Sequence, residues 1–322
     1  MERPINWGII GTGKIANKFA LALKHVPGSC MKAVASREKT KAELFASQHN
    51  IEKSYGSYLE LAEDKKVEVV YVATPHVFHF ENTMMCLHNN KAVLCEKPFA
   101  MNLNEVTQMV ELARQKNLFL MEALWTRFFP GTLRILEIVN SGAIGDIKYI
   151  RSDFGFKGIF DPDGRLFNKA LGGGSLLDIG IYPVFISLLL LGVPDEVSSE
   201  AIIGPTNVDE SVSMVFKYNN GSLASLSSTF MANTPIETDI CGTLGMIRIP
   251  KPWFMSRGFS LILNDGTKED FNREFICNGY EYEAIEVNNC LRLGKTESSL
   301  MTHDFSLKLI GLLDKVREQS HF

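Results

Sequence analysis

The sequence predicts an α/β protein of two parts, the first built around a parallel β-sheet and the second around a largely antiparallel one. Three observations support this prediction. Runs rich in valine and isoleucine alternate with helix-like segments through the first 121 residues, a pattern typical of βαβ units. After Met121, short strand-like segments separated by turn-forming pairs prevail. The 322 residues and the apolar fraction of 45% indicate about two globular domains.

In the first half, each expected strand is followed by an expected helix. The apolar runs of strand length are Ile5–Ile10, Met31–Ala35, Val67–Thr74, Ala92–Cys95 and Leu118–Met121. The helix-like segments between them are Ile15–His25, Lys39–His49, His79–Asn89 and Asn104–Gln115. Because parallel strands need such crossover connections, we expect one parallel sheet in residues 1–122.

The second half, residues 123–322, has the pattern of an α+β domain with an open antiparallel sheet. A helix at about Thr132–Asn140 precedes a strand at Ile147–Phe154, a glycine-rich turn and a long apolar helix. Five or six short strands are expected between Val197 and Leu263, including Ser211–Tyr218, Ser222–Thr229 and Met246–Ile249. Asn220-Gly221 is a hairpin signal, and Asp265-Gly266 is a second turn-forming pair. Two helices, Tyr280–Leu293 and His303–Gln319, end the chain, and the last could pack back on the first domain.

The composition argues against several classes of partner. A net charge of −4 does not favour nucleic acid. The N-terminus lacks the basic and apolar regions of a secretory signal. The apolar run Ile179–Leu191 is too short to span a bilayer and is expected to be a buried helix. The six cysteines lack CxxC spacing and are expected to be reduced thiols of a cytoplasmic protein. Neither a membrane nor a nucleic acid is expected as a partner.

A glycine-rich motif follows the first strand and opens the first helix. It reads Gly11-Thr12-Gly13-Lys14-Ile15-Ala16. Glycines at these places permit a tight turn and let the backbone approach a pyrophosphate, while the helix N-terminus supplies N–H donors. GxGxxA is a weak pattern alone, but its position in a βαβ unit favours a Rossmann dinucleotide-binding domain. A glycine-rich turn without a ligand is the alternative.

The end of the second strand distinguishes the two nicotinamide cofactors. NAD enzymes usually carry an acidic residue there, which binds the ribose hydroxyls. Here Ser36 takes that position and Arg37 follows it, so a 2′-phosphate meets no negative charge and has a bidentate partner. The sequence therefore predicts NADP over NAD. In the alternative interpretation, Glu38 holds Arg37 in a surface ion pair.

Glu96-Lys97-Pro98 ends another strand of the parallel sheet, at the edge where ligands of such sheets bind. With this segment the chain resembles the glucose–fructose oxidoreductase / inositol dehydrogenase (Gfo/Idh/MocA) family, whose hallmark is GxGxx(G/A) followed by EKP. Two further segments look like the dimeric dihydrodiol dehydrogenase branch of that family. These are Gly172–Tyr182, with tyrosine where many members have histidine, and Met121–Pro130.

The resemblance implies three catalytic residues. Tyr182 would be the general acid/base, and a nearby Lys97 ammonium would lower the pKa of its phenol. Asp178, at i, i+4 from Tyr182 on a helix, would bind a substrate hydroxyl or anchor Lys97. The alternatives are an ordinary buried tyrosine and an aspartate that caps a helix.

The resemblance also suggests residues around the cofactor and the substrate. Thr74, His76 and Glu96 would border the cofactor, with Glu96 as a structural partner rather than a catalyst. His79 is expected at a helix start; His76 and His79 lack the further ligands of a metal site. Trp125, Phe154 and Arg165 are expected in the substrate pocket, whereas the roles of Arg127 and Trp253 stay open. The Lys97–Pro98 bond is expected to be cis.

Together these features predict an NADP-dependent oxidoreductase. It would transfer a hydride between nicotinamide and a secondary alcohol or carbonyl of a vicinal diol, either a trans-dihydrodiol or a sugar such as xylose. An inositol or keto-sugar enzyme and a non-catalytic dinucleotide-binding regulator are the alternatives; a regulator would need neither Lys97 nor Tyr182. The second domain would bind the small-molecule polyol and form a homodimer or a dimer of dimers through its sheet. Substrate identity, stereochemistry and direction stay open.

Overall fold

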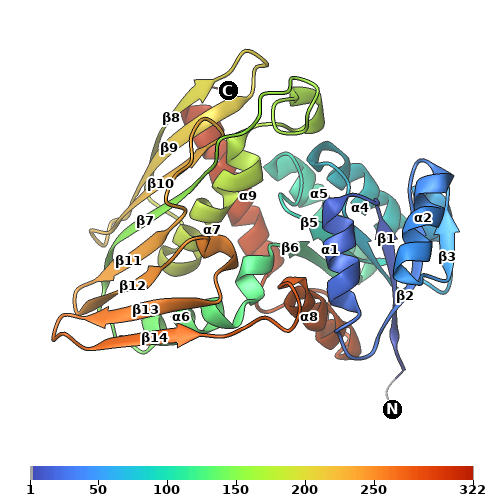
Figure 1. Ribbon diagram of the computed structural model, residues 1–322, viewed down its shortest axis with the longest axis horizontal. Coiled ribbons are helices and arrows are strands. Elements are labelled where there is room, and N and C mark those ends of the chain that lie inside the picture. Colours follow the sequence, from blue (N-terminus) through green and yellow to red (C-terminus); the bar gives the residue numbers. More distant parts are fainter. Residues whose placement is uncertain (1–2, 322) are drawn as a thin grey trace. The chain divides into compact units, whose positions relative to one another are not determined.

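The computed structural model describes residues 3–321, and its contacts divide them into two compact units (Figure 1). The first contains the chain up to Phe128 and Phe275–Leu307, and the second contains Phe129–Glu274 and the chain from Lys308 on. The sequence suggested a single boundary after residue 122. The structure differs because the segment around α8 (Tyr280–Arg292) packs beside α1 (Lys14–Leu23).

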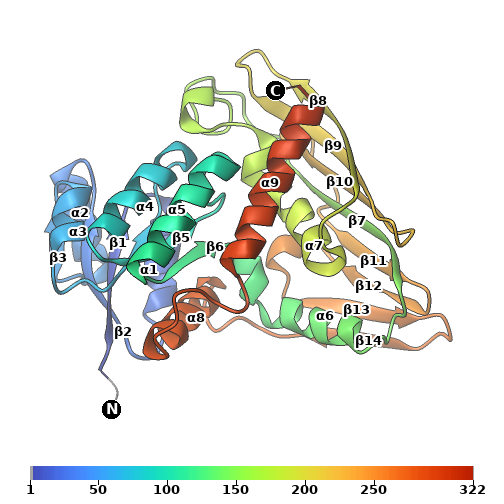
Figure 2. The same ribbon diagram turned by 180° about the vertical axis from the view of Figure 1, so that it is seen from behind.

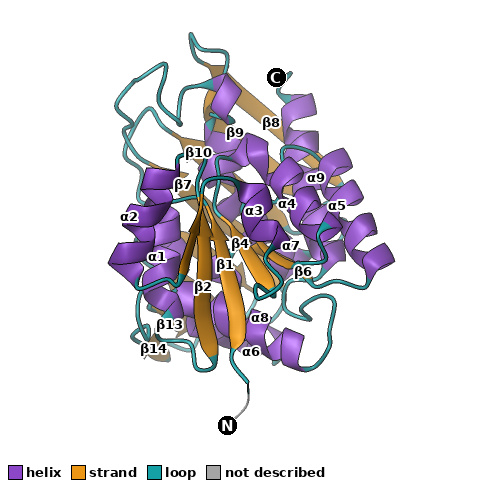
Figure 3. Cartoon of the chain, turned by 90° about the vertical axis from the view of Figure 1, so that its right-hand side faces the viewer, coloured by secondary structure: helices purple, strands orange, loops and turns teal. Residues whose placement is uncertain are grey.

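The first unit has a parallel six-stranded sheet of order β3-β2-β1-β4-β5-β6, as the sequence predicted. Its strands are β1 (Ile5–Ile10), β2 (Ser29–Ala35), β3 (Lys53–Tyr55), β4 (Val69–Val72), β5 (Ala92–Glu96) and β6 (Leu120–Ala123). This is the order of a Rossmann fold. Helices α1 and α2 (Lys39–His49) lie on one side of the sheet. Helices α3 (Tyr58–Glu63), α4 (His79–His88) and α5 (Leu103–Lys116) lie on the other (Figure 3).

The second unit has an eight-stranded sheet of order β14-β13-β12-β11-β7-β10-β9-β8. Its strands are β7 (Ile147–Gly155), β8 (Glu196–Ile203), β9 (Asp209–Lys217), β10 (Leu223–Thr229), β11 (Thr238–Gly242), β12 (Gly245–Ile249), β13 (Gly258–Leu263) and β14 (Lys268–Asn272). All neighbours are antiparallel except β7 and β10. The prediction of a largely antiparallel sheet is therefore confirmed. The predicted hairpin forms at Asn220-Gly221, and a second hairpin forms at the turn pair Asp265-Gly266.

Helices cover one face of this sheet. Figure 2 shows α6 (Pro130–Asn140), α7 (Ile181–Leu191) and the part of α9 (His303–Gln319) that belongs to the second unit on the same side. The hydroxyl of Ser199 in β8 donates to the carbonyl of Val316 in α9 at 3.0 Å. The helical stretch Lys169–Leu191, which includes α7, is long and apolar enough to cross a membrane. The apolar run Ile179–Leu191 within this stretch was expected to be too short to do so. Because 83% of the stretch's apolar 18-residue window is buried inside the protein, it is a core helix, as expected.

Candidate active site

The glycine motif has the shape that a pyrophosphate needs. Gly11 has a φ of +101°, and a β-carbon there would lie 2.6 Å from the carbonyl oxygen of Ala73, so no other residue fits without displacing backbone. Gly13 precedes α1 in extended conformation, and no side chain caps the helix. Ala16 is fully buried, whereas Gly13, Lys14 and Ile15 are exposed. The open helix N-terminus is thus available to an anion.

Arg37 is exposed at the carboxyl end of β2 and is oriented by a ring. Its guanidinium carbon lies 5.6 Å from the centre of the Phe78 ring, a cation–π distance. Glu38, the alternative partner, forms its ion pair with Lys41 at 2.6 Å. The buried Ser36 accepts a hydrogen bond from the Glu38 backbone N–H at 3.3 Å. Within residues 3–321, Arg37 forms no ion pair with a carboxylate, and Glu38 pairs with Lys41 instead.

The loops after β4 and β5 are tied together by the fully buried ring of His79. One ring nitrogen lies 2.9 Å from the carbonyl oxygen of Thr74 and the other lies 2.7 Å from that of Pro98. Since both nitrogens face backbone oxygens, His79 holds the two loops together. The buried His76 packs edge-on against His79, with ring centres 5.7 Å apart.

Glu96 and Lys97 stand at the carboxyl end of β5. The hydroxyl of Tyr71 donates to the Glu96 carboxylate, and the Lys97 backbone N–H donates to its other oxygen at 3.2 Å. Glu96 is buried, and these contacts join it to β4 and to the backbone at the end of β5. The Lys97–Pro98 peptide is cis, as expected. Tyr71, which no local pattern singles out, was missed because its partner lies 25 residues further along the chain.

A second buried carboxyl supports the same loop from β6. Glu122 accepts the backbone N–H of Phe99, two residues after Lys97, at 3.0 Å. Burial raises the pKa of Glu122 to about 7, against hydrogen bonds from Ser306 and from the Phe99 backbone that favour the charged form. Glu122 was not predicted to be a site residue, although it lies in the segment Met121–Pro130.

Trp125 and Arg127 follow β6 in a 3₁₀ turn (Trp125–Phe128), and both are buried. The Trp125 ring packs on Tyr280 of α8, with centres 4.5 Å apart. Within residues 3–321, the Nε and Nη1 atoms of Arg127 have no hydrogen-bond partner. Burial lowers the pKa of Arg127 to about 10, while Glu286 acts in the opposite direction. A buried cation with two unused donors is costly, which indicates a position for an acceptor group of a ligand.

In the second unit, the glycine triplet wraps a buried carboxylate. A β-carbon on Gly174 would lie 2.2 Å from Oδ1 of Asp209, and Gly174 has a φ of +123°. Asp209 accepts the Leu176 backbone N–H at 2.6 Å and the Ser175 hydroxyl at 3.0 Å. Burial raises the pKa of Asp209 to about 6 despite these hydrogen bonds. Asp209 thus fixes the start of the helical segment that carries Asp178 and Tyr182.

Asp178 is paired with Arg165 rather than standing alone. Two guanidinium nitrogens of Arg165 reach the two carboxylate oxygens at 2.9 and 3.0 Å. Asp178 lies in a π-helical turn (Leu176–Gly180) that leads into α7, so the α-helical spacing assumed for it does not hold. The ion pair brings together two residues that were both expected in the site. The sequence did not predict the pair, because its two members are 13 residues apart.

Tyr182 is 5% exposed and lies in an aromatic cluster. Its ring centre is 5.7 Å from that of Phe154, 5.2 Å from that of Phe254 and 6.5 Å from that of Trp253. Phe154 and Phe254 stack at 4.1 Å. The sequence analysis named Phe154 and Trp253 but not Phe254. Trp253 donates its indole N–H to the carbonyl of Asp153 at 2.9 Å, which gives it a structural role.

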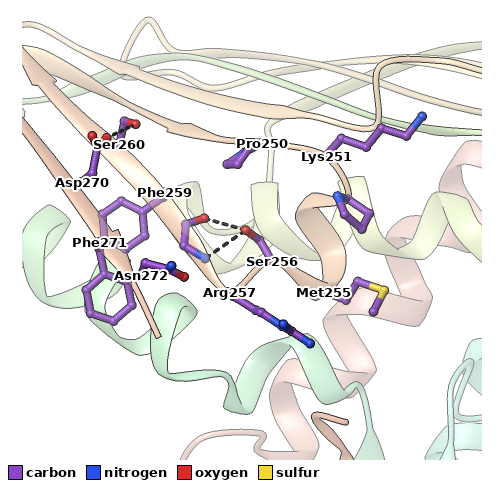
Figure 4. Close-up of a pocket in the computed structure, with 12 residues that line it drawn as sticks. Pro250, Lys251, Met255, Ser256, Arg257, Phe259, Ser260, Asp270, Phe271 and Asn272 are labelled. Carbon is purple, nitrogen blue, oxygen red and sulfur yellow. Dashed lines mark hydrogen bonds between the residues drawn. The ribbon is translucent and has the colours of Figure 1, made fainter. Parts of the chain in front are cut away.

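A separate hollow of about 530 Å³ lies at the sheet edge of the second unit (Figure 4). The rings of Phe259 and Phe271 stack 5.2 Å apart beside it, and the Ser256 hydroxyl donates to the Gly258 carbonyl at 2.5 Å. Its lining includes Lys251 and Arg257 but none of the residues expected to bind cofactor or substrate. The candidate residues therefore lie elsewhere: the cofactor residues on one edge of the parallel sheet, and Asp178, Arg165, Phe154 and Tyr182 together in the second unit.

Comparisons with known proteins agree with both halves. Residues 5–124 match the model of an oxidoreductase family with an NAD-binding Rossmann fold, and residues 132–248 match a GFO/IDH/MocA C-terminal domain. The chain is 42% identical to trans-1,2-dihydrobenzene-1,2-diol dehydrogenase of Xenopus laevis, over 97% of each chain. It is 40% identical to the protein of that name from Danio rerio, over 98% of this chain and 96% of the relative. A crystal structure of KijD10, a 3-ketoreductase from Actinomadura kijaniata in complex with NADP and TDP-benzene, has a TM-score of 0.88 at 25% identity, with 98% of each chain covered.

Proposed function

Because the chain belongs to the Gfo/Idh/MocA oxidoreductase family, we propose that it is an NADP-dependent dehydrogenase of vicinal diols. The substrate is a trans-dihydrodiol or a sugar such as xylose. The observation that carries the proposal is the likeness, over nearly the whole chain, to dehydrogenases named for a dihydrodiol. The NADP-bound ketoreductase structure supports the choice of cofactor.

The first unit suits a dinucleotide because the glycine motif after β1 forms a tight turn at Gly11, where a β-carbon would clash with the backbone of Ala73. Gly11 to Ile15 hold the pyrophosphate, and Ser36 and Arg37 hold the 2′-phosphate. Thr74, His76, Glu96 and Lys97 border the nicotinamide half, because they follow β4 and β5 at the ligand-binding edge of the sheet. A nicotinamide held by these residues would supply the hydride chemistry.

The chain's own residues move the proton and orient the alcohol. Tyr182 donates its phenolic proton to a carbonyl that is being reduced, or accepts the hydroxyl proton of an alcohol that is being oxidised. Lys97, at the carboxyl end of β5, supplies an ammonium that can polarise a substrate oxygen. Asp178, oriented by its bidentate contact with Arg165, binds the neighbouring hydroxyl. Phe154, whose ring centre lies 5.7 Å from that of Tyr182, supplies an apolar wall beside it.

A substrate screen tests this function. NADP reduction is followed with xylose, glucose, myo-inositol and trans-1,2-dihydrobenzene-1,2-diol, with NAD as the control cofactor. We expect turnover with xylose or the dihydrodiol and much less with NAD. Turnover with myo-inositol alone would instead place the chain with the inositol dehydrogenases. No turnover with any of the four would contradict the proposal.

A keto-sugar reductase is the second candidate, favoured by the similarity to the 3-ketoreductase structure. The same residues serve both directions of the reaction, because a proton donor for the ketone is the proton acceptor for the alcohol. Oxidation of NADPH by a keto-sugar, with no reduction of NADP by the diols, would favour this candidate.

Replacing Arg37 with alanine should weaken NADPH binding by roughly 1.5–3 kcal/mol, or about 10- to 150-fold, because a charge-assisted contact to the 2′-phosphate is lost. NADH affinity should barely change. Fluorescence titration with both cofactors measures the two dissociation constants. Lys41→Ala is the matched control, since Lys41 is an exposed cation of the same region. Equal losses for NADPH and NADH would refute the phosphate contact.

We expect a cytoplasmic homodimer, or a dimer of dimers, formed through the helix-free face of the eight-stranded sheet. That face carries Tyr149, Ile202, Val215 and Leu223, which are 40–64% exposed, and such apolar surface favours association. Light scattering after gel filtration at micromolar concentration measures the mass. Val215→Lys places a like charge on both copies at a symmetric contact and should yield monomers. A monomeric wild-type chain would overturn this expectation.

A further inference from the structure

A pocket in the second unit, separate from the residues assigned above, is built to hold a hydrocarbon ring. It has a volume of about 240 Å³ and is lined by Lys157, Gly158, Phe160, Phe167, Pro205, Glu210, Phe230 and Met231. For comparison, an apolar protein cavity of about 150 Å³ takes up benzene. The volume and the predominantly apolar lining suit one six-membered ring better than a sugar, whose hydroxyls would lack partners.

The walls of the pocket are held by contacts within the second unit. Phe160 packs edge-on against Phe167 with centres 5.1 Å apart, and Phe167 packs edge-on against Phe230 at 5.9 Å, a favoured geometry for aromatic pairs. The Gly158 backbone N–H donates to the Phe230 carbonyl at 2.8 Å. The Lys157 backbone N–H donates to the Asn233 side chain at 3.0 Å. A preformed site of this kind loses little entropy on binding.

At the mouth of the pocket, apolar side chains are exposed to solvent. Phe160 is 52% exposed and Met231 is 45% exposed, while Phe167 and Phe230 behind them are buried. A ring that entered would cover the exposed part of both side chains, and burial of apolar surface supplies the binding free energy. Lys157 is also exposed, which leaves a cation for a polar substituent on the ring.

Two connections link the pocket to the proposed catalytic residues. Aromatic rings run from Phe230 to Phe156 at 5.2 Å, from Phe156 to Phe154 at 6.4 Å, and from Phe154 to Tyr182 at 5.7 Å. The loop that carries Phe160 and Phe167 also carries Arg165, which holds Asp178. A ligand in the pocket would therefore touch the loop that orients Asp178.

From these observations we infer that this pocket is a binding site for a single aromatic or dihydroaromatic ring. The ring belongs to a ligand separate from the diol substrate, because the hydroxyl carbons of a dihydrodiol are part of its ring, and Phe156 and Phe154 stand between Phe230 and Tyr182 in the chain of ring contacts. The first experiment below is independent of the proposed function, and the second rests on it.

Toluene is the probe for the first experiment, and the methyl group of Met231 is the reporter. In the full chain with ¹³C-labelled methionine methyls, toluene should shift the Met231 signal in a saturable way; Met231→Leu identifies that signal by its loss. Phe160→Ala should weaken toluene binding at least about tenfold, because one wall of the pocket is removed. Ile159→Ala is the matched control, since Ile159 is 89% exposed in the same loop and does not line the pocket. A Met231 signal that does not saturate, or equal affinity in Phe160→Ala and wild type, would overturn the inference.

The second experiment tests whether this ligand is separate from the substrate. If it is, Phe160→Ala leaves KM unchanged for both trans-1,2-dihydrobenzene-1,2-diol and xylose, and toluene competes with neither. Competition between toluene and the diol would overturn the inference that the ligand is separate. If Phe160→Ala lowers the oligomer mass and leaves toluene affinity unchanged, the exposed rim is a contact between copies of the chain and the inference fails.

Discussion

Replacing Tyr182 with phenylalanine should lower kcat about 100-fold or more, while the affinity for NADPH stays nearly the same. The variant removes only the hydroxyl oxygen, and with it the proton that the reacting oxygen needs. The ring is held by its contacts with Phe154, Phe254 and Trp253, which phenylalanine keeps. The loss should therefore lie in the chemical step and leave the fold intact.

Single-turnover kinetics with excess enzyme separates this step from substrate binding and product release. Tyr218→Phe is the matched control, because Tyr218 is another buried tyrosine of the second unit and its hydroxyl contacts Ser187 at 2.8 Å. It should cost about 1 kcal/mol of stability and leave kcat unchanged. Turnover at the wild-type rate in Tyr182→Phe would remove Tyr182 from its proposed role.

The sequence predicted most of the regular elements because their signals are local. In the parallel half, buried strands are continuous apolar runs and the helices between them are long, so Lys39–His49 was located to the residue. β3 and α3 were missed because a three-residue strand and a six-residue helix carry little periodicity. β14 was missed because it is an edge strand with charged residues at Lys268, Glu269 and Asp270, a composition that protects sheet edges.

The candidate site could be predicted only where one segment carries the chemistry. The glycine cradle and the segment around Lys97 each follow from a short motif whose backbone role is fixed by its place in a βαβ unit. The residues that orient the site segments lie elsewhere in the chain. Glu122 holds Phe99 in the loop after β5, while Arg165 and Asp209 hold Asp178 and the glycine triplet of the second unit. Such contacts form only when the chain is folded, and they have no sequence spacing that a pattern could detect.

Glu122 offers a test of how the loop after β5 is held, because its ionisation should make the protein less stable as the pH rises. Its folded-state pKa is about 7, above the ordinary 4.5, chiefly because of burial; Glu96 acts in the same direction, and Lys97 opposes it. Below pH 4.5 the carboxyl is neutral in the folded and in the unfolded chain, and its contribution to the free energy of unfolding is complete. Between pH 4.5 and 7 the unfolded chain loses this proton while the folded chain keeps it. Stability should therefore fall across that range, by about 3 kcal/mol, and stay level above it.

Glu122→Gln should abolish this loss, because the amide cannot ionise while its oxygen still accepts the Phe99 N–H. Urea unfolding at pH 5 and pH 8 measures the effect as the difference between variant and wild type, which cancels the titration of other groups. The variant should gain up to about 3 kcal/mol over wild type on going from pH 5 to pH 8. Glu111→Gln is the matched control on the exposed face of α5 and should follow wild type at both pH values. If Glu122→Gln does the same, the Glu122 carboxyl is ionised in the folded protein, and it must hold the Phe99 N–H as a full charge rather than as a neutral acid.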